Sequence, residues 1–97
     1  FGAPAVEVLV EALGHPEMWI RIHAMEALAQ IKDTRVTSIL LEMLSDPERE
    51  VKKRAIQSLG KLRDPRASAA LQEIAANRSD RELHTLAKEA LEGQTRV

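Results

Sequence analysis

The stretch LAQIKDTRV, residues 28–36, decides the fold, because LGKLRDPRA at residues 59–67 repeats its pattern. The aligned pairs lie 31 residues apart in every case: Leu28 with Leu59, Ile31 with Leu62, Asp33 with Asp64, and Arg35 with Arg66. A chain that repeats itself at a fixed interval of this length is typical of an array of similar structural units.

The same interval runs through the rest of the chain. Leu9, Leu40 and Leu71 are spaced by 31 residues, and the third copy holds one extra residue within AANRSD at 75–80. We therefore expect a single repeat domain over residues 1–97. Its three repeats are expected at about 3–33, 34–64 and 65–94.

Each copy has the pattern of two helices joined by a short turn. In TRVTSILLEML (34–44) apolar residues recur at helical spacing, and in EREVKKRAIQSLGKL (48–62) they form one stripe opposite the charges. The first helices are expected near 4–13, 35–44 and 66–76, and the second near 17–31, 48–62 and 81–92. Asp46-Pro47 and Asp64-Pro65 should each supply an N-cap followed by a proline at the first helical position.

A single helix pair cannot bury its apolar face alone, so the pairs must stack and share a core. The expected fold class is therefore all-α, an α-α superhelix (α-solenoid) of three stacked helix pairs.

Composition excludes several classes of protein. Hydrophobic residues make up 44% of the chain, and 14 Lys+Arg against 15 Asp+Glu leave a net charge of -1, without the basic excess of a dedicated nucleic-acid binder. The absence of cysteine rules out disulfides, thiolate nucleophiles and Cys-ligated zinc. No apolar run approaches the ~20 residues that span a bilayer, and nothing resembles a signal peptide. We expect a cytoplasmic protein without membrane insertion and, because Phe1 stands where Met would start, a fragment of a longer chain.

Two segments, HPEMWIRIHAMEALAQIKDTRV (15–36) and DPEREVKKRAIQSLGKLRDPRA (46–67), resemble HEAT repeats of the short subtype named after phycobilisome lyases. The resemblance implies that first helices line the convex side and second helices the concave side. The third copy departs from the pattern, since it lacks the Asp-Pro turn and carries Lys88 where Met25 and Ile56 stand. A charge at that position favours the end of the stack, whereas TRV at 95–97 repeats TRV at 34–36 as if another unit began.

Residues for catalysis are not assembled by any motif. The serines lie in helix or cap contexts, without the strained turn that an activated serine needs. His23 and Glu26 are three apart on one helical face and could share a metal ion, but zinc takes three or four protein ligands. We expect no enzyme activity, no cofactor and no metal site.

The concave surface is the remaining candidate. Trp19, the only tryptophan, would anchor a partner with Ile22 and Leu86, while Lys53 and Arg54 would pair with carboxylates of the partner. The residues expected to bind the partner are Trp19, Ile22, His23, Glu26, Lys53, Arg54, Gln57, Thr85, Leu86 and Glu89. The alternative interpretation is that these are scattered exposed residues without a function.

The expected function is a protein–protein interaction scaffold that binds a partner peptide or helix. One alternative, an accessory part of a chromophore lyase-like protein, is implied only by the name of the subtype. Another is a nucleic-acid-binding solenoid, which the acidic residues Glu26, Glu50, Glu82 and Glu89 on the same face disfavour.

The first helix, in APAVEVLVEAL at 3–13, is apolar on nearly all sides. A helix of this kind is usually buried on all sides. Val6 and Val10 are therefore expected to dock on a preceding repeat or a second subunit, and the other interpretation is local packing under Phe1.

Overall fold

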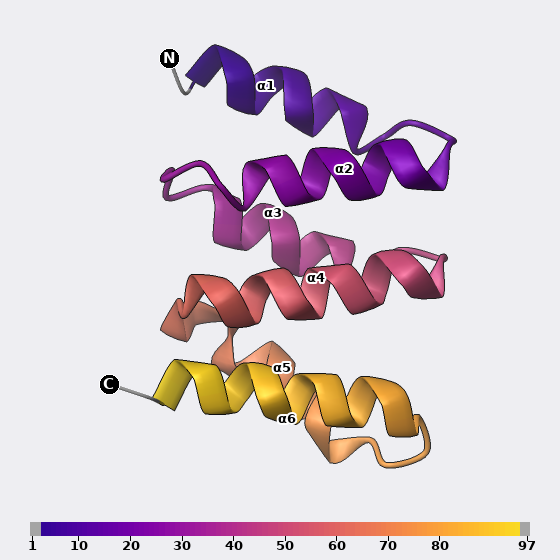
Figure 1. Cartoon of the computed structure of the whole chain (residues 1–97). Helices are drawn as coiled ribbons and strands as arrows, with labels where there is room; N and C mark the ends of the chain where they lie inside the picture. Colours follow the sequence, from indigo (N-terminus) through magenta and orange to yellow (C-terminus); the bar gives the residue numbers. More distant parts are fainter. Residues whose placement is uncertain (1–2, 96–97) are drawn as a thin grey trace.

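Helices stack in three antiparallel pairs in the computed structural model, which describes residues 3–95 (Figure 1). All regular structure within this range is helical. The elements are α1 (Ala3–Ala12), α2 (Met18–Leu28), α3 (Val36–Met43), α4 (Arg49–Leu62), the 3₁₀ helix η1 (Pro65–Ala67), α5 (Ser68–Ala76) and α6 (Arg81–Thr95). The expected all-α solenoid is thus confirmed.

The second helices form one layer and the first helices another. In Figure 1, α2, α4 and α6 lie one above the other, with α3 and α5 behind them. Helix α4 packs against both α2 and α6. The Cα atoms extend over 37 × 32 × 15 Å, which is a slab two helix layers thick. None of the helices between residues 3 and 95 is both long and apolar enough to cross a bilayer.

The repeated apolar positions build the core that the layers share. Leu28 and Leu59, which opened the comparison of the copies, are both fully buried, as are Leu40 and Leu71. Burial of these apolar side chains stabilises the fold by roughly 25 cal/mol for each Å² that is removed from water. The 31-residue interval therefore places an equivalent core residue in successive repeats.

The repeated Asp-x-Arg turns have the same structure in both copies. The Asp33 carboxylate accepts from the backbone N–H of Arg35 at 2.8 Å and pairs with its guanidinium at 2.9 Å. Asp64 does the same with Arg66, at 2.9 and 2.6 Å. Asp64 also accepts from the hydroxyl of Thr37 at 2.7 Å, so this turn joins the third repeat to the second.

Only one of the two expected Asp-Pro helix starts is correct. Asp64 accepts from the N–H of Arg66 and Pro65 opens η1, as expected. Asp46 instead accepts from the N–H of Glu48 at 2.9 Å in a turn, and α4 begins only at Arg49. Glu48, and not Asp46, directly precedes the first residue of α4, while the Asp46 carboxylate also binds Nε of Arg21 in the first repeat at 3.0 Å.

One side of each second helix faces the following repeat, and Ile22 lies on that side. Lys53 on α4 reaches Glu82 on α6, with Nζ 3.1 Å from Oε2. Ile22 stands 31 residues before Lys53, so it faces α4 and is fully buried. Its expected exposure is wrong, because isoleucine has no charged end that can extend to water as that of lysine does. The repeat interval alone does not determine burial, because Ile20 precedes the buried Val51 by 31 residues and is nevertheless 40% exposed.

Val6 and Val10 on α1 also face the following repeat, since both line a groove between α1 and α3. Docking of Val6 on another unit is wrong, because its side chain is already buried in the core. Val10 is exposed at the groove, and its docking on another unit stays a prediction. The most exposed valine of α1 is Val8, at 67%, which stands 31 residues before Ile39.

Candidate functional site

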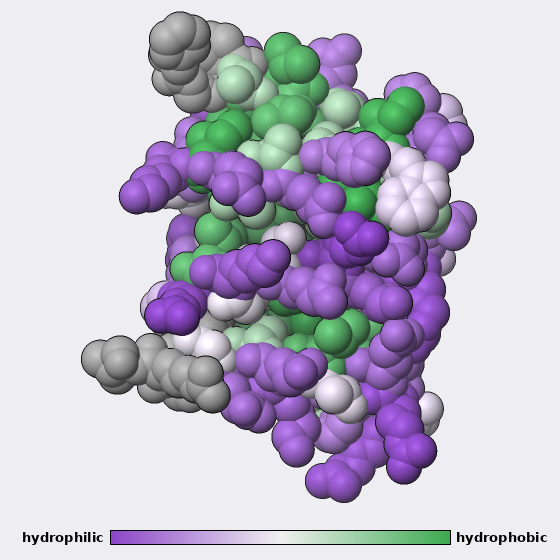
Figure 2. All heavy atoms as spheres, viewed as in Figure 1, coloured by the Kyte–Doolittle hydropathy of each residue, from purple (hydrophilic) through white to green (hydrophobic). Residues whose placement is uncertain are grey.

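The face of α2, α4 and α6 holds nine of the ten expected partner-binding residues at or near the surface, and Ile22 is the exception. The exposed ones are Trp19, His23, Gln57, Thr85 and Glu89, and the half-buried ones are Glu26, Lys53, Arg54 and Leu86. Figure 2 shows hydrophilic side chains over most of this face, with hydrophobic ones gathered mainly over α1 and α2. The surface is therefore polar with few apolar contacts, and we call it the second-helix face.

Trp19 is the largest apolar feature of the second-helix face, and it is held in place. It is the second residue of α2 and remains 45% exposed. The guanidinium carbon of Arg54, on the neighbouring helix, lies 5.7 Å from the centre of the indole ring, within cation–π range. The ring of His23, one turn further along α2, packs at 6.2 Å and 41°. These contacts restrict the rotamers of Trp19 without covering it.

Arg54 is fixed by two carboxylates from two different repeats. Its Nε lies 3.0 Å from Glu50 on the same helix, and one terminal nitrogen lies 2.8 Å from Glu26 on α2. These hydrogen bonds, first to Glu26 and then to Glu50, raise the pKa of Arg54. The guanidinium therefore joins two repeats and supports the indole at the same time.

The ion pairs continue from α4 to α6. Lys53 lies 3.1 Å from Glu82 and 3.6 Å from Glu50, and the bond to Glu82 is the main cause of its raised pKa. Arg49 reaches Asp80 at 2.6 Å and Glu82 at 3.2 Å. The hydrogen bond from Arg49 lowers the pKa of Asp80 to about 2.

These contacts correct the expectation that Lys53 and Arg54 are free to pair with an acidic partner. Both cations are already matched within the chain. The network contains three cations and four carboxylates, so its formal charge is -1: Arg49, Lys53 and Arg54 against Glu26, Glu50, Asp80 and Glu82. Sequence reasoning missed this because both partners of each pair were counted as separate surface charges.

The contacts of Glu26 and His84 show which polar side chains link neighbouring repeats. Glu26, which in the sequence could share a metal ion with His23, is held by Arg54 instead. The Nδ1 of His84 hydrogen-bonds the carbonyl oxygen of Ala75, so this contact stays within one repeat. The corresponding contact of Arg21 does cross repeats, to both oxygens of Asp46 at 3.0 and 3.1 Å.

A hollow of about 410 Å³ lies between α4 and α6 on the second-helix face. Leu86 forms part of its wall, with Gln57 and Glu89 beside it. The two helices approach closely here, since a Cβ atom on Gly60 would lie only 2.9 Å from the Cα and Cβ atoms of Ala90. Three of the expected partner-binding residues thus surround one concave feature.

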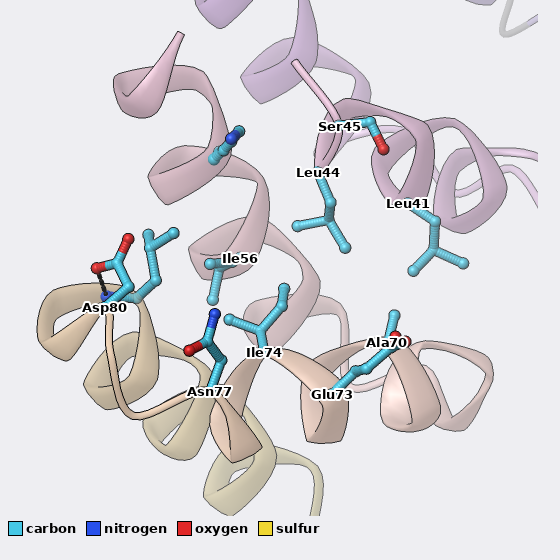
Figure 3. Close-up of a pocket in the computed structure, with 11 residues that line it drawn as sticks. Leu41, Leu44, Ser45, Ile56, Ala70, Glu73, Ile74, Asn77 and Asp80 are labelled. Atoms are coloured by element: carbon cyan, nitrogen blue, oxygen red, sulfur yellow. Dashed lines mark hydrogen bonds between the residues drawn. The ribbon is translucent and has the colours of Figure 1, made fainter. Parts of the chain in front are cut away.

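Sequence reasoning missed a second hollow, on the side of the first helices. A groove of about 520 Å³ runs between α3 and α5, and Figure 3 shows Leu44, at the end of α3, pointing toward Ile74 on α5, with Leu41 pointing toward Ala70. The signal in the sequence was Leu41, an apolar residue outside the buried stripe of its helix. Because stripes predict only the core, they gave no reason to expect a groove.

Comparison with known proteins agrees with the architecture. A family model of HEAT repeats matches residues 4–92 of the chain. No curated protein matches the sequence.

Proposed function

Because this chain belongs to the HEAT-repeat family, by a match over residues 4–92, we propose that it is a non-catalytic protein-interaction scaffold. The partner contributes a peptide or a helix, which lies across α2, α4 and α6. Helix-in-groove recognition of this kind uses a few apolar anchors on a rigid surface.

The observation that carries the proposal is the held, exposed Trp19. Tryptophan is enriched among residues that dominate binding energy, because it brings a large area and a polar N–H. Arg54 and His23 already restrict this ring, so less conformational entropy is lost when a partner covers it. Leu86, at the hollow between α4 and α6, supplies a second apolar contact.

The ion pairs decide what kind of contact the partner makes. Since Lys53 and Arg54 are matched by Glu26, Glu50 and Glu82, an acidic partner would have to displace them. Apolar contact at Trp19 therefore supplies most of the affinity. A nucleic-acid partner is disfavoured for the same reason, because phosphate binding needs unmatched cations. The chromophore lyase-like alternative stays a prediction without a supporting contact.

The test is replacement of Trp19. Trp19→Ala should weaken binding to a captured partner protein by about 2 kcal/mol or more, because it removes the central anchor. Val8→Ala is the matched control, since Val8 is exposed but lies on α1. Calorimetric titration measures both, and circular dichroism checks that helicity is kept. Equal affinity of the wild-type chain and Trp19→Ala would remove Trp19 from the interface.

A further inference from the structure

The groove between α3 and α5 has an apolar floor made by both helices. Leu44, at the end of α3, and Ile74 on α5 point toward one another across it, Leu41 points toward Ala70, and the three larger side chains are half-buried (Figure 3). Polar side chains surround this floor, among them Asn77 and Asp80 at one end. The groove therefore offers apolar contacts that the fold leaves unfilled.

A second groove, of about 520 Å³, repeats this arrangement between α1 and α3. Val10 and Ile39 form its apolar part. Val10 stands 31 residues before Leu41, so the same helix position contributes to both grooves. The two grooves are adjacent, with α3 between them, and they belong to the first helices rather than to the second-helix face.

Each groove carries one glutamate at the same position of its wall. Glu42 lines the groove between α1 and α3, and Glu73, 31 residues later, lines the groove between α3 and α5. Both are exposed, and over residues 3–95 neither makes an ion pair or a side-chain hydrogen bond. The glutamates of the second-helix face differ in this respect, because Glu26, Glu50 and Glu82 are all matched by cations.

Each groove is lined by one cation, and one of the two is paired within the chain. Arg35, which lines the first groove, is paired with Asp33 at 2.9 Å. Lys52, which lines the second, makes no ion pair or side-chain hydrogen bond within residues 3–95. Taken together, the unpaired charges along the two grooves are therefore negative, with Glu7, Glu42 and Glu73 against Lys52.

From this combination we infer that the grooves between the first helices bind a basic amphipathic segment of a partner protein. Apolar side chains of that segment enter beside Leu41, Leu44 and Ile74, and flanking lysine or arginine side chains reach Glu42 and Glu73. This surface is separate from the second-helix face, so a scaffold could hold two partners at once. Complementary charge of this kind selects partners and speeds their association more than it adds affinity.

The test uses a fluorescein-labelled synthetic helix with leucines on one face and lysines beside them, and a second peptide with glutamates in place of the lysines. Fluorescence anisotropy at low salt should show at least about fivefold tighter binding of the lysine peptide. The double variant Glu42→Gln, Glu73→Gln should lose about fivefold in affinity for it. Ala70→Leu, which fills the groove between α3 and α5, should weaken binding of the same peptide.

The matched control is the double variant Glu11→Gln, Glu89→Gln. It removes the same net charge, and Glu11 holds the helix position of Glu42 and Glu73 without lining a groove. An equal loss with this control, or equal binding of both peptides, would overturn the inference. So would loss of lysine-peptide binding in Trp19→Ala, which would assign the peptide to the second-helix face. A dimer in sedimentation that Ala70→Leu breaks would assign the groove to a second copy of the chain and also overturn it.

Discussion

Arg54 has a different role from the one its position in the sequence suggested. It was expected to contact a partner carboxylate, but it binds Glu26 and Glu50 and stands beside the indole of Trp19. Arg54 therefore helps to position the indole of Trp19. The conclusion is that charge on a repeat surface becomes informative only once its partners within the chain are known.

Carboxylates in the turns should make the protein sensitive to acid. The hydrogen bond from the Arg35 side chain lowers the pKa of Asp33 to about 2, against about 3.9 in an unfolded chain. Arg66 lowers the pKa of Asp64 in the same way, with Thr37 contributing. Since the unfolded chain binds more protons in this range, the stability they contribute is full above about pH 4 and is lost as the pH falls toward about 2.

Thermal unfolding followed by circular dichroism between about pH 7 and about pH 2 measures this loss. In Asp33→Asn the midpoint should fall less steeply with acid, because one of the groups with a lowered pKa is gone. Glu89→Gln is the control, since that carboxylate is exposed and makes no hydrogen bond or ion pair within the described residues. An acid limb of the same slope in Asp33→Asn and wild type would show that this turn does not contribute.

Ile22 shows why single residues were harder to place than helices. The sequence places it 31 residues before Lys53, which reaches the surface through its long side chain. The repeat pattern therefore made both positions look exposed. Burial at this position depends on which residue occupies it, and only the packing of α2 on α4 reveals that.

At the scale of elements, α4 and α6 can approach closely because Gly60 has no side chain. A Cβ on Gly60 would lie 2.9 Å from Ala90, closer than packed carbon atoms allow. Gly93 also lies at this contact, but a Cβ there would be 3.5 Å from the Gly60 carbonyl oxygen, an ordinary distance. A methyl group therefore does not fit at Gly60 but does fit at Gly93.

Gly60→Ala should lower the free energy of unfolding by about 1–3 kcal/mol, because the helices must separate to admit the methyl group. Gly93→Ala should leave stability unchanged or raise it by up to about 1 kcal/mol, because alanine favours the helix. Urea denaturation measures both changes. If Gly60→Ala were as stable as Gly93→Ala, the close approach of α4 and α6 would not limit the packing.

Helix positions followed from the sequence because their signals are local. Second helices were expected near 48–62 and 81–92, and α4 and α6 occupy Arg49–Leu62 and Arg81–Thr95. The Asp46 side chain was expected to cap α4, but it interacts with Arg21, which is 25 residues away. Local patterns therefore predict helices well, whereas caps shared between repeats need the assembled stack.

At the scale of the whole molecule, the two helix layers present different surfaces. The second-helix face has charges matched across repeats and one exposed indole. The first helices have apolar grooves with the unmatched Glu42 and Glu73. The repeat interval predicted that layers exist, but the grooves arise from how far neighbouring first helices stand apart, which no single repeat encodes.

On the proposed function, a partner protein covers Trp19 on the second-helix face. The chain has one tryptophan, so its indole N–H gives a single signal in a proton–nitrogen correlation spectrum. On titration of the isotope-labelled chain with a captured partner, this signal and the amide signals around Arg54 should shift or broaden together. An unmoved indole signal, while amides elsewhere on the chain respond to the bound partner, would contradict the claim.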